Sequence, residues 1–79
     1  MSKVQSIVFF RVDGWTMRQM HNFLTRHHLQ PIKFYTTNTQ YRFRVQEPLQ
    51  FAHFITKRVM AHQTQTVKKP VLLVIGFTN

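Results

Sequence analysis

The chain has 79 residues, which is enough for one compact core but not for two. Eleven Lys and Arg residues against two acidic residues give it a formal net charge of +9. This excess is typical of proteins that bind nucleic acid or another polyanion, and charge without a direct function is the alternative. The chain has no cysteine for disulfides or thiolate zinc sites, and its longest apolar run, Val71–Ile75, is too short to cross a membrane. We therefore expect one basic domain over residues 1–79, soluble and intracellular, without a standard secretion signal.

The N-terminal part of the chain predicts a strand followed by a helix. Val4–Val12 is rich in β-branched and aromatic residues, which favours a strand with apolar groups on both faces. Apolar residues then recur at three- and four-residue steps, which predicts an amphipathic helix over residues 16–28. Thr16 is placed to cap that helix, and Gln19, at its third position, is placed to complete a capping box.

A hairpin is predicted next. Pro31 prevents the helix from continuing, and Ile32–Tyr35 then alternates between apolar and polar residues as a strand does. The polar cluster Thr36–Thr39 is typical of a hairpin loop, and Gln40–Val45 returns as the partner strand.

The C-terminal part predicts a second helix and a last strand. Proline at a first helical turn and apolar residues at helical spacing favour an amphipathic helix over Pro48–Ala61, although parts of this segment also tolerate an extended path. Residues 62–70 are expected to form a polar linker. The apolar run Val71–Ile75 predicts a strand buried on both faces that ends at Gly76.

The predicted order is strand, helix, strand, strand, helix, strand. This order indicates a ferredoxin-like βαββαβ two-layer α+β sandwich with an antiparallel sheet. The first and third strands are central in that arrangement. Because the first and last strands are apolar on both faces, we expect an apolar patch on the helix-free face of the sheet. A partner, stacked bases or a second copy in a homodimer would cover it.

Positive charge concentrates first on the predicted hairpin. In a strand over Tyr41–Val45, the two-residue period sends Arg42 and Arg44 to one face and the apolar residues to the other. Lys33 and Tyr35 on the partner strand would extend this face into a basic, partly aromatic surface suited to phosphate. The alternative is a solvated sheet face whose arginine stems cover apolar neighbours.

A second basic set flanks the predicted linker, with Lys57 and Arg58 before it and Lys68 and Lys69 after it. Lysines of this kind can follow a phosphate backbone without reading base sequence. An ordinary exposed face is again the alternative.

The sequence offers little for metal binding or catalysis. Its five histidines are His21, His27, His28, His53 and His62. No pair of them has the four-residue spacing of a zinc helix, and no cysteine or local carboxylate completes a ligand set, so we expect no metal and no cofactor. The two carboxylates, Asp13 and Glu47, lie more than thirty residues apart, and we therefore expect no enzyme.

Two resemblances can be drawn. The element order looks like an RNA recognition motif, but Gln40–Val45 lacks the glycine and the aromatic spacing of that motif's third strand. More of the chain resembles small basic proteins of large eukaryotic DNA viruses such as marseilleviruses. This resemblance rests on Trp15-Thr16, His27-His28-Leu29-Gln30-Pro31-Ile32-Lys33, Tyr41-Arg42-Phe43-Arg44 and Val74-Ile75-Gly76-Phe77. It departs from the expected pattern where Lys68-Lys69-Pro70 replaces a glycine before the last strand.

The viral resemblance implies a protein of the virion, or of the virus factory in the host cytoplasm, that packages viral DNA beside other virion proteins. We therefore expect a non-enzymatic, low-specificity nucleic-acid-binding protein, and the resemblance is the reason to favour double-stranded DNA over RNA. One alternative is an interaction protein that docks on acidic protein surfaces through an apolar sheet face rimmed by charge. Another is an RNA-binding module that stacks bases on exposed Phe or Tyr side chains.

Overall fold

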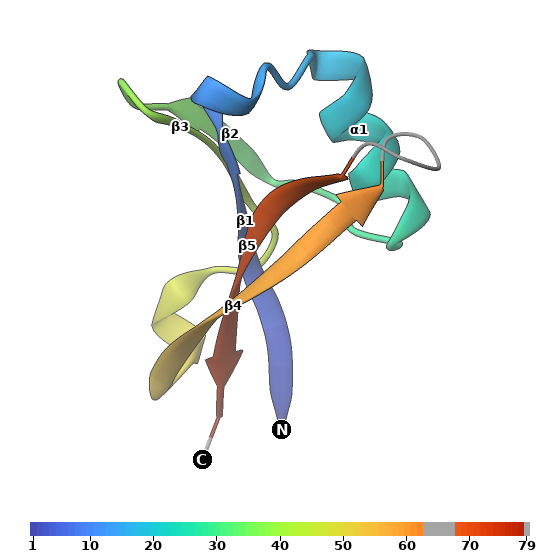
Figure 1. The fold of residues 1–79 in the computed structure, drawn as a ribbon. Helices are drawn as coiled ribbons and strands as arrows, with labels where there is room; N and C mark the ends of the chain where they lie inside the picture. Colours follow the sequence, from blue (N-terminus) through green and yellow to red (C-terminus); the bar gives the residue numbers. More distant parts are fainter. Residues whose placement is uncertain (63–67, 79) are drawn as a thin grey trace.

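The computed structural model describes residues 1–62 and 68–78, and within them the chain forms a five-stranded antiparallel sheet with one α-helix against it (Figure 1). In chain order the elements are β1 (Ser2–Phe10), η1 (Arg11–Asp13), α1 (Met17–Arg26), β2 (Lys33–Thr36), β3 (Gln40–Arg44), η2 (Pro48–Gln50), β4 (His53–His62) and β5 (Lys68–Phe77). The sheet order is β2-β3-β1-β5-β4, so β1 lies at its centre.

The register of β1 defines the two faces of the sheet. Residues directly opposite each other on neighbouring strands share a face, and faces alternate along each strand. Ile7 and Phe9 belong to the buried cluster that includes the helix side chains, and we call their side the helix face. Ser6 and Val8 therefore point to the other side, which we call the open face.

The start of α1 confirms the predicted capping box. The Thr16 side chain accepts a hydrogen bond from the Gln19 backbone N–H at 3.1 Å, and the Thr16 backbone N–H donates to Gln19 Oε1 at 3.0 Å. The helix ends at Arg26, two residues before the predicted limit. It stops there because His28 adopts a left-handed conformation with φ of 57°, which lets the Leu29 N–H donate to the Leu24 carbonyl at 2.8 Å.

The core lies between α1 and the centre of the sheet, and aromatic rings dominate it. The Phe9 ring makes edge contacts with Trp15, Phe23 and Phe43 at centroid distances of 4.7, 5.6 and 5.7 Å. Such pairs stabilise beyond the area that they bury. The complete cluster comprises Ile7, Phe9, Trp15, Met20, Phe23, Leu24, Phe43, Ala61 and Val71.

The predicted second helix over Pro48–Ala61 is wrong, and with it the ferredoxin-like βαββαβ fold. That segment forms the short η2 turn and then β4, which pairs with β5 along its whole length. The fold is α+β with one helix in its described part and strand order 2-3-1-5-4. The apolar residues at helical spacing do not share a buried face, because Phe54 and Ile55 are both exposed on opposite sides of β4. The β-branched residues and the long partner strand decide the conformation.

The predicted linker over residues 62–70 is also wrong at both ends. His62 is the last residue of β4, and β5 begins at Lys68 rather than at Val71. Pro70 is tolerated inside β5 because it pairs only with Met60 of β4, beyond the point where pairing with β1 stops. The rest of the predicted linker, residues 63–67, lies outside the described residues.

Candidate nucleic-acid interface on the open face

The open face carries a row of five side chains that crosses every strand. The register of the sheet places these residues directly beside one another in the order Tyr35, Arg42, Val8, Leu72, Arg58. Cationic side chains therefore stand on both sides of an aliphatic centre. The two cations of this row, Arg42 and Arg58, come from β3 and β4, which lie three strand spacings apart.

Lys33, Tyr35, Arg42 and Arg44 form a compact group at the β2–β3 end of the open face, which we call the Tyr35 cluster. Lys33 Nζ lies 5.9 Å from the centroid of the Tyr35 ring, and the Cζ atoms of Arg42 and Arg44 each lie 6.0 Å from it. Attraction to the ring holds each cation, while the three positive charges repel one another. An anion bound among them would relieve that repulsion.

Both arginines of the Tyr35 cluster are partly withdrawn from solvent. Arg42 and Arg44 are half-buried, and their Nε atoms are buried without a hydrogen-bond partner among the described residues. Ser6 Oγ, which lies on the same face between these arginines and β5, is also buried without a hydrogen-bond partner among the described residues. Because part of each guanidinium group is already withdrawn from water, its outer N–H donors lose less hydration when they bind an anion.

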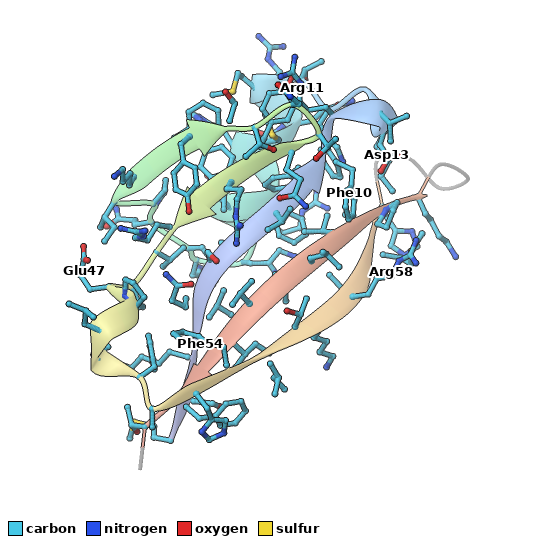
Figure 2. All side chains as sticks on the ribbon, turned by 90° about the vertical axis from the view of Figure 1, so that its left-hand side faces the viewer. Phe10, Arg11, Asp13, Glu47, Phe54 and Arg58 are labelled. Atoms are coloured by element: carbon cyan, nitrogen blue, oxygen red, sulfur yellow. The ribbon has the colours of Figure 1, made fainter. Side chains whose placement is uncertain are left out.

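The two acidic side chains do not neutralise this face. Figure 2 looks onto it and shows Glu47 beside the η2 turn and Asp13 at the opposite upper corner, with the sheet between them. Arg58 lies on the outer strand of the same view. The electrostatic potential over the sheet is therefore set by its cations.

The structure places six of the eight residues predicted to bind nucleic acid on the open face and two on the helix face. Lys33, Tyr35, Arg42, Arg44 and Arg58 lie on the open face, and the register places the exposed Lys68 on the same side at the far end of β5. Lys57 and Lys69 point to the helix face. Lys69 is occupied there, because its Nζ donates to Gln19 Oε1 at 3.3 Å and lies 5.1 Å from the Trp15 ring.

Sequence reasoning missed Lys3 as a cation of the open face. Simple alternation from Ile7 would place Lys3 on the helix face. A bulge between Val4 and Ser6 inserts one residue into β1 and reverses the alternation, so that Lys3 lies opposite Gly76 on the open face. No local pattern in the sequence marks this bulge.

Several histidine rings of the described chain pack against aromatic side chains. The rings of His27 and His53 pack against Phe23 and Phe77 at centroid distances of 4.4 and 4.9 Å. Within residues 1–62 and 68–78, no group of three His, Asp or Glu side chains could hold a metal ion. The same residues contain no helix long and apolar enough to span a membrane.

Comparisons of this chain with protein-family models, with curated proteins and with solved structures find no match. The arrangement on the open face is therefore the basis on which its function is argued.

Proposed function

We propose that this chain binds double-stranded DNA without reading its sequence, through phosphate contacts made by the cations of the open face. The observation behind the proposal is the Tyr35 cluster, in which three cations surround one ring and no carboxylate joins them. Arginine guanidinium groups bind phosphate oxygens in pairs of parallel hydrogen bonds, which suits Arg42 and Arg44 to this role.

The spacing of the cations supports a duplex ligand. Three strand spacings separate the backbones of Arg42 and Arg58, or about 14 Å. The major groove of B-form DNA is about 12 Å wide, so cations at this separation would reach phosphates on its two sides. Stacking of unpaired bases has less support, because the Tyr35 ring is half-buried and already has three cations around it.

The middle of the row supports low sequence specificity. Val8, which is only 2% exposed, and Leu72 separate the cations, and neither side chain donates or accepts a hydrogen bond. Base edges are read through hydrogen bonds from side chains in the groove, and this part of the face offers none. Binding would be dominated by the phosphate backbone and would weaken steeply with salt.

The cellular role that we propose is packaging of viral DNA in the virion or virus factory, and it rests on the resemblance to small basic viral proteins. Phosphate binding by the open face does not depend on that resemblance, whereas the preference for DNA over RNA rests on it and on the width of the DNA major groove.

The decisive experiment is a salt titration of binding to a random-sequence duplex, measured by fluorescence anisotropy. The Arg42→Gln/Arg44→Gln variant is compared with Arg18→Gln/Arg26→Gln, which has the same net charge but loses two exposed arginines of α1. We expect the first variant to bind about tenfold more weakly at moderate salt and to reduce the slope of log K against log salt by about 2. The second variant should keep the wild-type slope.

Three outcomes would contradict the proposal. Equal losses in both variants would mean that net charge alone drives binding. Affinity that does not change with salt would exclude phosphate contacts. Tighter binding to single-stranded DNA or RNA of the same length would favour the RNA-binding alternative. Circular dichroism melting curves confirm that each variant is folded.

A further inference from the structure

The outer edge of β4 is long, and no other strand of the described chain pairs with it. β4 pairs with β5 without interruption from His53 opposite Phe77 to His62 opposite Lys68, so its other side presents backbone groups over ten residues. The opposite edge of the sheet, β2, has only four residues. Natural proteins shield long edges with proline, bulges or a covering segment, and β4 has neither proline nor an irregular register. Among residues 1–62 and 68–78, the feature that protects this edge is its pair of central cations, Lys57 and Arg58.

An apolar groove runs beside this edge on the helix face. α1 covers one end of the sheet, and towards the other end the helix face has no second layer (Figure 1). The groove has a volume of about 430 Å³, and its apolar lining includes Val4, Phe23, Leu29, Val59, Ala61 and Leu73. Further along the same face of β4, the Ile55 side chain is 49% exposed.

The charge of β4 decides what can pair with this edge. Lys57 and Arg58 stand at the middle of the strand and point to opposite faces, and β4 contains no acidic residue. If two copies paired antiparallel through β4, their helix faces would lie on the same side, so Lys57 would stand opposite Lys57, or Arg58 opposite Arg58, of the other copy. Like charges directly opposite are destabilising, and each copy has a net charge of +9. The edge therefore disfavours a second copy and favours an acidic strand.

We propose that β4 is a docking edge for an extended acidic segment of a protein partner, which adds to the sheet as an antiparallel sixth strand. Backbone hydrogen bonds along the edge would provide affinity, and alternate side chains would provide specificity. Residues of the partner opposite Lys57 and Arg58 are acidic. Those opposite Ile55 and Val59 are apolar, and the one opposite Val59 lies at the mouth of the groove.

This register fixes the order of residues in the partner. An antiparallel strand passes Val59, Arg58, Lys57, Thr56 and Ile55 in that order. The recognised segment therefore reads apolar, acidic, acidic, any residue, apolar. A peptide with the core Leu-Glu-Glu-Thr-Val satisfies this order, and Leu-Lys-Lys-Thr-Val is its matched control.

The first test swaps charge between the full chain and the two labelled peptides. Binding is measured by fluorescence anisotropy at about 150 mM salt, because surface charges are then screened beyond about 8 Å. The wild-type chain should bind the Glu-Glu peptide at least about tenfold more tightly than the Lys-Lys peptide. The Lys57→Glu/Arg58→Glu variant should reverse this preference. Both positions are exposed, so the variant should fold. Failure of the preference to reverse would overturn the proposal.

The second test separates strand addition from simple charge attraction. The Glu-Glu peptide is N-methylated at alternate residues, in one version on the edge that would face β4 and in the other version on the outer edge. N-methylation removes hydrogen-bond donors and leaves charge unchanged, so only the first version should lose binding. Equal binding of the two versions would overturn the proposal.

Two controls separate this edge from the DNA-binding face and from self-association. The Arg42→Gln/Arg44→Gln variant should bind the Glu-Glu peptide within about twofold of wild type, since neither residue touches β4 in the sheet order. Loss of peptide binding in this variant would assign the acidic peptide to the Tyr35 cluster instead and overturn the proposal. If sedimentation shows a dimer of the chain alone, and this dimer blocks binding of the Glu-Glu peptide, β4 pairs with a second copy and the proposal is overturned.

Discussion

The two halves of the sheet, on either side of the central strand β1, are built differently. The β2–β3 half is backed by α1 on one face, carries the Tyr35 cluster on the other and ends in a short edge. The β5–β4 half has the longer strands but shares the helix only at one end, where Ala61 and Val71 join the core. Its edge is long, and Phe54, Ile55 and Met60 are exposed along it.

This difference shows how one helix can support a five-stranded sheet. Side chains of α1 complete the core over β1 and β3, and β5 is held by pairing with β1 and by Lys69, which contacts Gln19 and Trp15 of the helix layer. β4 then depends on β5 for almost all of its pairing. We therefore expect substitutions in the first half to cost more stability than those along the outer strand of the second half.

The largest difference in stability between the two halves is expected when one apolar side chain is truncated in each of them. Phe43 in β3 is 1% exposed and contacts the rings of Phe9 and Phe34 at 5.7 and 4.7 Å. Phe43→Ala should cost about 3–5 kcal/mol because it leaves a cavity in the core. Ile55→Ala in β4 should cost less than about 1 kcal/mol because the side chain is half exposed. Urea denaturation of both variants measures the difference.

A chain of this length is expected to have a total stability of about 4–12 kcal/mol, and a loss of the size expected for Phe43→Ala is enough to unfold a protein at the lower end of that range. Phe43→Leu keeps most of the volume, and a loss smaller than that of Ile55→Ala would contradict the comparison.

A smaller effect is predicted at Gly76, where the β5–β4 half has cover of its own. The Phe51 ring, at the end of η2, lies against Gly76 on the open face, and a Cβ atom at Gly76 would overlap it. Gly76→Ala should therefore cost about 2 kcal/mol through displacement of the ring. In a Phe51→Ala background the same change should be neutral or stabilising, since alanine loses less backbone entropy than glycine. Thermal melting of the four proteins in this double-mutant cycle measures the coupling, and simple additivity would refute the contact.

The smallest effect is predicted at the end of α1. His28 holds a left-handed conformation that glycine adopts without strain, so His28→Gly should stabilise the chain by about 1 kcal/mol. His27→Gly is the control, because His27 has a negative φ and its ring packs against Phe23. A melting temperature that rises for His28→Gly and falls for His27→Gly supports this account, and a fall in both would contradict it.

The parts of the fold that were predicted correctly from the sequence are those that short-range patterns determine. The capping box at Thr16 and Gln19 requires only a three-residue spacing. The placement of Arg42 and Arg44 on one face and Phe43 in the core requires only a two-residue period in a regular strand. Most of the candidate site follows from that alternation.

The parts that were not predicted depend on contacts distant in the sequence. The conformation of β4 is fixed by its pairing with β5, and its apolar residues fit helical spacing only by coincidence. Lys69 appears available for phosphate until the fold places it beside Trp15. The face of Lys3 depends on a bulge that appears only in the register with β5. In each case the deciding contact is made with a residue that is distant in the sequence.

The central position of β1 has a consequence for the order of events in folding. One side of β1 pairs with β3, and its other side pairs with β5. Ile7 therefore lies opposite Leu73, which is near the other end of the described chain. Contacts so distant in sequence are slow to form, because a long loop must close before they are made. During synthesis the first half can assemble around α1, yet one side of its middle strand stays unpaired until Lys68–Phe77 has been made. The native sheet is therefore completed only when β5 is available, and until then the unpaired side of β1 is open to pairing with other chains.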